Sequence, residues 1–121
     1  MKTYNMESIR KIIREAVMSD MSCPLATQDS DLNSANKKKT AISNEYGLPT
    51  EEAKEKGQSC ANCVAFDISE RMKDCMGNSS GEVGYCWMHD FMCSGKKWCN
   101  TWLGNKPITS NIESYEKQLK K

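Results

Sequence analysis

Cysteine content is the feature that most limits what this chain can fold into. The 121 residues include seven cysteines but only one histidine, and thiols in such numbers indicate disulfides, a metal centre or redox chemistry. Hydrophobic residues make up 38% of the sequence and aromatic residues 7%, so the apolar core of one domain of this size is modest. We therefore expect bonds made by the thiols to help the chain fold.

The N-terminal sequence and the charge balance bear on compartment and partners. Arg10, Lys11 and Arg14 interrupt the apolar run that a signal peptide needs, and no segment is apolar enough to cross a bilayer. We therefore expect a cytoplasmic protein, or a periplasmic one if a leader has been removed. In a reducing cytosol, thiol clusters serve metals or catalysis more often than disulfides. A net charge of +1 with both signs mixed along the chain gives no indication of nucleic-acid binding.

Residues 1–36 are expected to form an N-terminal region of their own. Between Met6 and Met18 the apolar residues share one face of a helix and leave a basic face opposite. Residues 19–36 are polar and lack periodicity, which predicts an irregular arm. The helix over 6–18 either covers its own domain or docks a neighbouring subunit in an oligomer.

Residues 37–106 are expected to form the compact domain, followed by a terminal helix. Two short helices are predicted at 40–46, which ends at a glycine, and at 50–56, which starts at a threonine cap. In residues 107–121 a capping box begins at Ser110 and precedes apolar residues that share a helix face. Together these predict a small metal-stabilised fold, mostly irregular, with short helices.

The spacing of the cysteines favours an iron-sulfur cluster over a zinc ion. Cys60 and Cys63 form a C-x2-C pair, a spacing shared by zinc, iron-sulfur and redox sites. Zinc modules usually supply two close pairs of ligands, whereas this chain has one close pair and one histidine. A four-iron cluster takes one thiolate at each iron, so its ligands can come singly from different segments. Cys86 and Cys99 suit that requirement, while a zinc module and a plain disulfide scaffold remain open as alternatives.

Three motifs resemble those of the high-potential iron-sulfur proteins over about residues 40–106. They are Gly57-Gln58-x-Cys60-x-Asn62-Cys63-x-x-Phe66, Gly84-x-Cys86 and Trp98-Cys99-x-x-Trp102. The resemblance implies a small, mostly irregular fold with short helices and little β-structure. It also implies that one [4Fe-4S] cluster is bound by Cys60, Cys63, Cys86 and Cys99, and that the protein carries single electrons to a redox partner protein.

Aromatic side chains concentrate around these cysteines and are expected to keep water from the cluster. Phe66, Trp98 and Trp102 lie within three residues of a cysteine in sequence. The resemblance further implies that Tyr46, upstream of the first cysteine, packs on the cluster. His89 is expected at the surface rather than as a ligand, because a Rieske-type site needs two histidines.

The three remaining cysteines are assigned no part in the cluster. Cys23 is expected to be an unpaired thiol in the arm, and Cys75 and Cys93 to be buried as small hydrophobic residues. A disulfide between Cys75 and Cys93 is the alternative in an oxidising environment, and Cys75 is also the reserve ligand if Cys86 is not one.

No pair of side chains has the spacing of a catalytic site, so we expect a protein that is not an enzyme. An alternative to electron transfer is a structural or assembly role. In that case the cluster ties a small domain together and the terminal helices dock partner subunits of a larger assembly.

Overall fold

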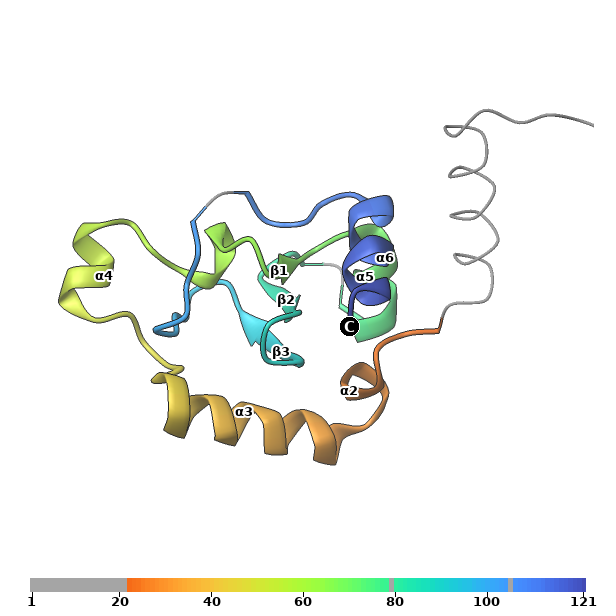
Figure 1. The fold of residues 1–121 in the computed structure, drawn as a ribbon, viewed down its shortest axis with the longest axis horizontal. Helices are drawn as coiled ribbons and strands as arrows, with labels where there is room; N and C mark the ends of the chain where they lie inside the picture. The colour runs from red at the N-terminus through yellow and green to blue at the C-terminus, as the bar shows by residue number, and fades with distance from the viewer. Residues whose placement is uncertain (1–21, 79, 105) are drawn as a thin grey trace, which may run out of the picture.

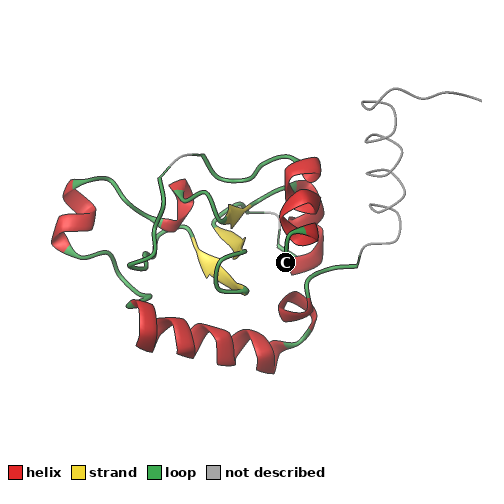
Figure 2. Ribbon diagram, in the orientation of Figure 1, coloured by secondary structure: helices red, strands yellow, loops and turns green. Residues whose placement is uncertain are grey.

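The computed structural model describes residues 22–78, 80–104 and 106–121. Within these ranges, five α-helices lie around a small antiparallel sheet, joined by long loops (Figures 1 and 2). The expectation of a small fold with short helices and little β-structure is confirmed to this extent. The helix predicted over 6–18 lies outside the described residues. The helices are α2 (Leu25–Gln28), α3 (Ser30–Asn44), α4 (Glu51–Glu55), α5 (Glu70–Met76) and α6 (Asn111–Leu119).

The sheet contains β1 (Phe66–Asp67), β2 (Val83–Cys86) and β3 (Phe91–Ser94) in that order. Alternate side chains of a strand point to opposite faces, and this alternation separates two hydrophobic cores. The first core contains Cys60, Cys63, Ala65, Phe66, Phe91 and Cys93. The second contains Ala26, Met72, Tyr85, Trp87 and Ile108. The free cysteines therefore gather on one side of the sheet.

Helix α3 is much longer than predicted, and the irregular arm expected over residues 19–36 is wrong where the structure describes it. The boundary expected after residue 36 falls inside this helix. Asp29 caps its N-terminus by accepting hydrogen bonds from the N–H groups of Asp31 and Leu32. The helix ends where Glu45 adopts a left-handed conformation with φ of 57°, and so before the glycine expected to stop it.

Helix α3 packs along β3 through polar side chains, which is why its hydrophobic pattern is weak. The Oδ1 atom of Asn33 accepts a hydrogen bond of 2.7 Å from the N–H group of Met92. Asn36 donates from Nδ2 to the carbonyl of Asp90, also at 2.7 Å. Thr40 is buried in the same helix. Hydrogen bonds to the β2–β3 hairpin thus replace the apolar contacts that periodicity detects. Figure 1 shows α3 lying alongside this hairpin.

The predicted caps of α4 and α6 are confirmed. Thr50 accepts a hydrogen bond from the N–H group of Ala53 at the start of α4, and Ser110 accepts one from Glu113 at the start of α6. In both cases a hydroxyl satisfies a backbone donor that the first helical turn leaves free.

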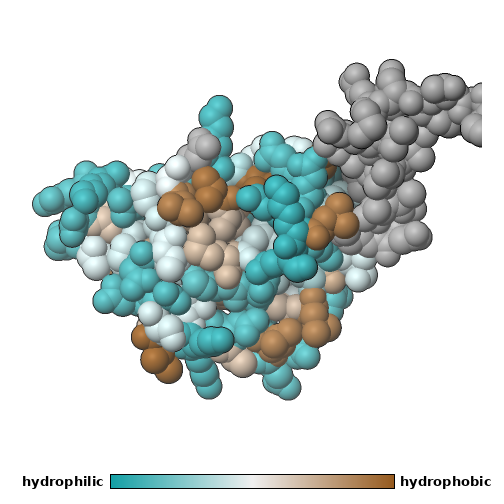
Figure 3. Space-filling model, in the orientation of Figure 1, coloured by the Kyte–Doolittle hydropathy of each residue, from teal (hydrophilic) through white to brown (hydrophobic). Residues whose placement is uncertain are grey.

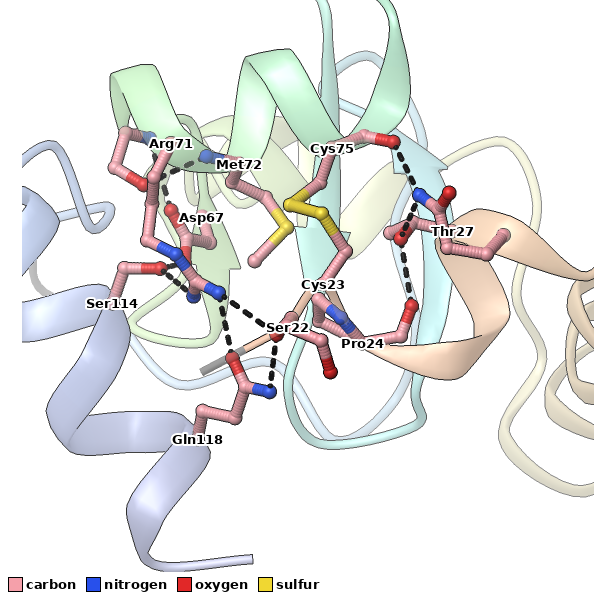
Figure 4. The surroundings of a disulfide bond; sticks show 12 residues. Ser22, Cys23, Pro24, Thr27, Asp67, Arg71, Met72, Cys75, Ser114 and Gln118 are labelled. Atoms are coloured by element: carbon pink, nitrogen blue, oxygen red, sulfur yellow. Dashed lines mark hydrogen bonds between the residues drawn. A yellow bond between two sulfur atoms is a disulfide. The ribbon is translucent and has the colours of Figure 1, made fainter. Parts of the chain in front are cut away.

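A buried polar network joins α6 to the sheet and to α5. The carboxylate of Asp67, which is fully buried, accepts hydrogen bonds from Trp87 Nε1 at 2.8 Å and from the Ser114 hydroxyl. Arg71 donates to Ser114 and Gln118 (Figure 4). Its guanidinium carbon lies 4.0 Å from the ring centre of Tyr115. Each buried polar side chain of this network therefore has a hydrogen-bond partner, as a stable core requires.

Cys23 forms a disulfide with Cys75, so the expectations for both residues are wrong. Cys23 is not an unpaired thiol, and Cys75 is neither paired with Cys93 nor available as a reserve ligand. The segment expected to be an arm instead packs on α5, where Gln28 donates to the carbonyl of Cys75 and Arg71 donates to that of Ser22 (Figure 4). Disulfides are rare in a reducing cytosol, so this bond is more typical of an oxidising compartment than of the cytoplasm expected from the N-terminal sequence.

On the face shown in Figure 3, hydrophilic and intermediate residues predominate and hydrophobic residues form small separate patches. Among the described residues, no helix combines the length and the apolar character needed to cross a bilayer. The large hydrophobic side chains that are exposed in this part of the chain are those of Leu25, Ile42, Leu48, Leu103, Ile112 and Leu119.

Loss of the disulfide should lower the free energy of unfolding by about 4 kcal/mol, because the cross-link joins residues 52 positions apart and restricts the unfolded chain. Urea denaturation of Cys23→Ser measures this. Wild-type protein unfolded in the presence of a phosphine reductant should match the variant. Equal stability of variant and oxidised wild type would contradict the prediction.

Candidate cysteine-lined site

One cavity on the first-core side of the sheet is lined by five free thiols. They come from η1 (Cys60–Asn62) and the residue after it, from both strands of the β2–β3 hairpin, and from the loop before α6. The four cysteines expected as ligands are thus brought together, and a fifth accompanies them. The five are Cys60, Cys63, Cys86, Cys93 and Cys99.

Asn62 fixes the turn that carries Cys60 and Cys63. Its Oδ1 accepts a hydrogen bond from the N–H group of Ser59 at 3.1 Å, and its Nδ2 donates to the carbonyl of Gly57 at 2.7 Å. The N–H group of Cys63 donates to the carbonyl of Cys60 within the same turn. This bonding explains why an asparagine in the C-x2-C motif helps to aim both sulfurs at one cavity.

The β2–β3 hairpin places Cys86 and Cys93 on the same side. Cys86 pairs with Phe91, and Cys93 pairs with Gly84. A Cβ atom at Gly84 would lie 2.6 Å from the ring of Phe66. The absence of a side chain at Gly84 therefore lets the Phe66 ring pack against the sheet beside the thiols.

Cys99 is held in a loop that is tied to other segments by backbone and side-chain hydrogen bonds. The N–H group of Trp102 donates to the carbonyl of Cys99 at 3.2 Å. The Thr101 hydroxyl lies 3.1 Å from the Cys99 sulfur, and it is also 2.7 Å from Nε2 of His89. His89 thus contacts the site through Thr101 and not through a sulfur.

Three of the four expected aromatic residues lie at the site. Phe66 and Trp102 line the cavity, and Tyr46 packs against the first core with its hydroxyl accepting a hydrogen bond from the N–H group of Ser94. Trp98 does not line the cavity: its indole donates to Gln58, and its backbone pairs with Gly47. Trp98 therefore joins the loop of Cys99 to the segment before Cys60.

The surroundings of the thiols shift their acidity in different directions. Hydrogen bonding to Cys93 and to the N–H groups of His89 and Met88 lowers the pKa of Cys86, against the effect of burial. Hydrogen bonds with Cys60 and Cys86, together with burial, raise the pKa of Cys93. Burial raises the pKa of Cys99, and it raises that of Tyr46 to about 12. Of Cys86, Cys93 and Cys99, only Cys86 has surroundings that favour the thiolate, the form that binds metals.

The sequence prediction missed Ala65, Met88, Cys93 and Thr101 as residues of the cavity. A usable signal existed for Cys93, because it lies two positions after Phe91 in a strand and alternate residues share a face. No comparable signal marks Met88 or Thr101, since both lie in loops whose path depends on the rest of the fold.

The five thiols surround a space and do not converge on a point. Among residues 22–78, 80–104 and 106–121, no three His, Cys, Asp or Glu side chains are placed to hold one metal ion. Comparisons with family models, curated proteins and solved structures find no match for the chain. The resemblance to high-potential iron-sulfur proteins therefore rests on the sequence motifs.

Substitution of Gly84 by alanine should lower the free energy of unfolding by about 1–3 kcal/mol, because the new methyl group would force the buried Phe66 ring to move. Chemical denaturation measures the change. Gly47→Ala is the matched control, since nothing lies within 4 Å of a Cβ atom there. Similar stability losses in both variants would show that crowding at Phe66 is not the cause.

Proposed function

We propose that the protein binds one [4Fe-4S] cluster through Cys60, Cys63, Cys86 and Cys99 and carries single electrons. The observation that supports this most is that these four cysteines, which come from three segments of the sequence, line one cavity. They are the same four residues whose motifs resemble the ligands of high-potential iron-sulfur proteins.

The donor set fits the chemistry of such a cluster. Each of four irons takes one thiolate, and the thiols come from the C-x2-C turn, the end of β2 and the loop before α6. Cys60, Cys63 and Cys99 are 8% exposed, so few water molecules would reach the sulfurs. The zinc alternative requires four donors at about 2.0–2.3 Å from a single ion, and the described residues include no group arranged for one ion.

The residues around the thiols would set the redox behaviour. When bound, the cluster supplies a centre that accepts and releases one electron. Ala65, Phe66 and Met88 give the cavity an apolar wall, and exclusion of water disfavours the more negatively charged reduced state. The Thr101 hydroxyl at Cys99 and the N–H groups near Cys86 act in the opposite direction, because hydrogen bonds to sulfur stabilise negative charge.

Replacement of Cys99 by alanine should remove the cluster, because one of the four irons would lose its thiolate. The loss is measured as iron and acid-labile sulfide per chain. It is also measured as absorption at about 400 nm, which comes from thiolate-to-iron charge transfer. Cys23→Ser is the control and should keep both. A colourless wild-type protein that contains zinc would overturn the proposal, as would full iron content in Cys99→Ala.

Replacement of Thr101 by valine should lower the reduction potential by up to about 40 mV, the equivalent of one net hydrogen bond of about 1 kcal/mol for a one-electron couple. The change keeps the side-chain shape and removes the hydroxyl at the Cys99 sulfur. A redox titration followed by electron paramagnetic resonance measures the shift. Thr27→Val is a control, since the hydroxyl of Thr27 bonds to the carbonyl of Pro24, outside the site. A centre without a reversible one-electron step would refute the carrier function and leave a structural one.

A further inference from the structure

We infer that Cys93 is a fifth thiol of the site, able to ligate the cluster when Cys86 or Cys60 does not. This inference rests on the proposed cluster and concerns only which thiolates can hold it. The sequence motifs give Cys93 no such role, so the inference comes from its position in the structure.

Position in the sheet directs Cys93 into the cavity. It is the third residue of β3, and its pairing partner on β2 is Gly84, which has no side chain. Cys93 is 3% exposed and belongs to the same core as Cys60 and Cys63. Its sulfur lines the cavity together with the four proposed ligands. A cysteine here thus lies in the first layer of side chains around the cluster.

Cys93 is close to two of the four proposed ligands. On the same face of the hairpin, Cys86 lies two positions along β2 from Gly84, the pairing partner of Cys93. Helix η1, which carries Cys60, contacts β3, and Cys60 and Cys93 belong to one core. The hydrogen-bond partner of Cys99 is the Thr101 hydroxyl. A thiol that lines the same cavity and packs beside a proposed ligand needs only a small displacement to take that ligand's place. We therefore expect Cys93 to be able to replace Cys60 or Cys86 as a ligand, but not Cys99.

The exchange requires no oxidant or reductant. In a protein that lacks the Cys86 sulfur, the Cys93 S–H bond breaks, and its proton passes to solvent. The resulting thiolate would take the place of the missing ligand. No atom would change oxidation state, so the cluster would keep its charge state and its four thiolates.

Four variants test the inference, with iron and acid-labile sulfide per chain as the readout. Cys93→Ala should keep the wild-type content, since four ligands remain. Cys86→Ala should keep at least half of it through Cys93. The double variant Cys86→Ala/Cys93→Ala should fall at least tenfold, as should Cys99→Ala, because Cys99 is not part of the core that contains Cys93. Cys60→Ala repeats the test at the second neighbour in case Cys86→Ala fails to fold.

Spectroscopy separates ligation by Cys93 from ligation by water. Electron paramagnetic resonance of oxidised Cys86→Ala should show a four-iron centre with g values shifted from wild type. If Cys86→Ala and Cys60→Ala both lose the cluster, or if the double variant keeps it, the inference is overturned. If the inference fails but Cys93→Ala has the wild-type iron content, the proposed function still stands. A wild-type protein without iron would instead refute the proposed function itself.

Discussion

The site depends on the alternation of side chains along the β2–β3 hairpin. Tyr85 and Trp87 point into one core, whereas Cys86 between them faces the other. On the facing strand, Phe91 and Cys93 follow the same rule. A shift of one residue in the register would move the thiols to the wrong side of the sheet. The hairpin register therefore decides whether a thiol-lined cavity exists at all.

The motif residues around the cysteines act mainly as hydrogen-bond partners that join loops. The indole of Trp102 donates to Asn62 and to the carbonyl of Ser59, while the indole of Trp98 donates to Gln58. Two residues of the Gly57–Phe66 motif are thus bonded to two residues of the motif around Cys99. Segments about 40 positions apart are aligned in this way without a strand or a helix. This arrangement explains how a site built from irregular loops can have a defined shape.

Sequence reasoning succeeded where a local signal decides the structure. Caps at Thr50 and Ser110 each involve residues three positions apart, and the convergence of the cysteines was expected from motifs that surround them. It failed where the decisive partners are distant in sequence. Helix α3 packs through Asn33 and Asn36, whose bonds to β3 and to the turn before it span more than 50 positions.

Contacts formed only in the folded chain also account for the missed disulfide and for the misplaced Trp98. Nothing near Cys23 in the sequence indicates that its segment packs on α5, since the bonds that hold it there come from Arg71 and Gln118. Trp98 lies next to a cysteine in sequence but is directed elsewhere by its bond to Gln58. Adjacency along the chain was a poor guide in both cases.

One disulfide and five free thiols in a single short chain place a demand on biogenesis. Oxidation of an unloaded chain would let seven cysteines pair in many combinations, most of them trapping non-native loops. In the proposed cluster, thiolates bound to iron would be withdrawn from that exchange. Insertion of the cluster before exposure to oxidants would leave Cys23 and Cys75 to find each other with few competitors, so the order of maturation would itself protect the native pairing.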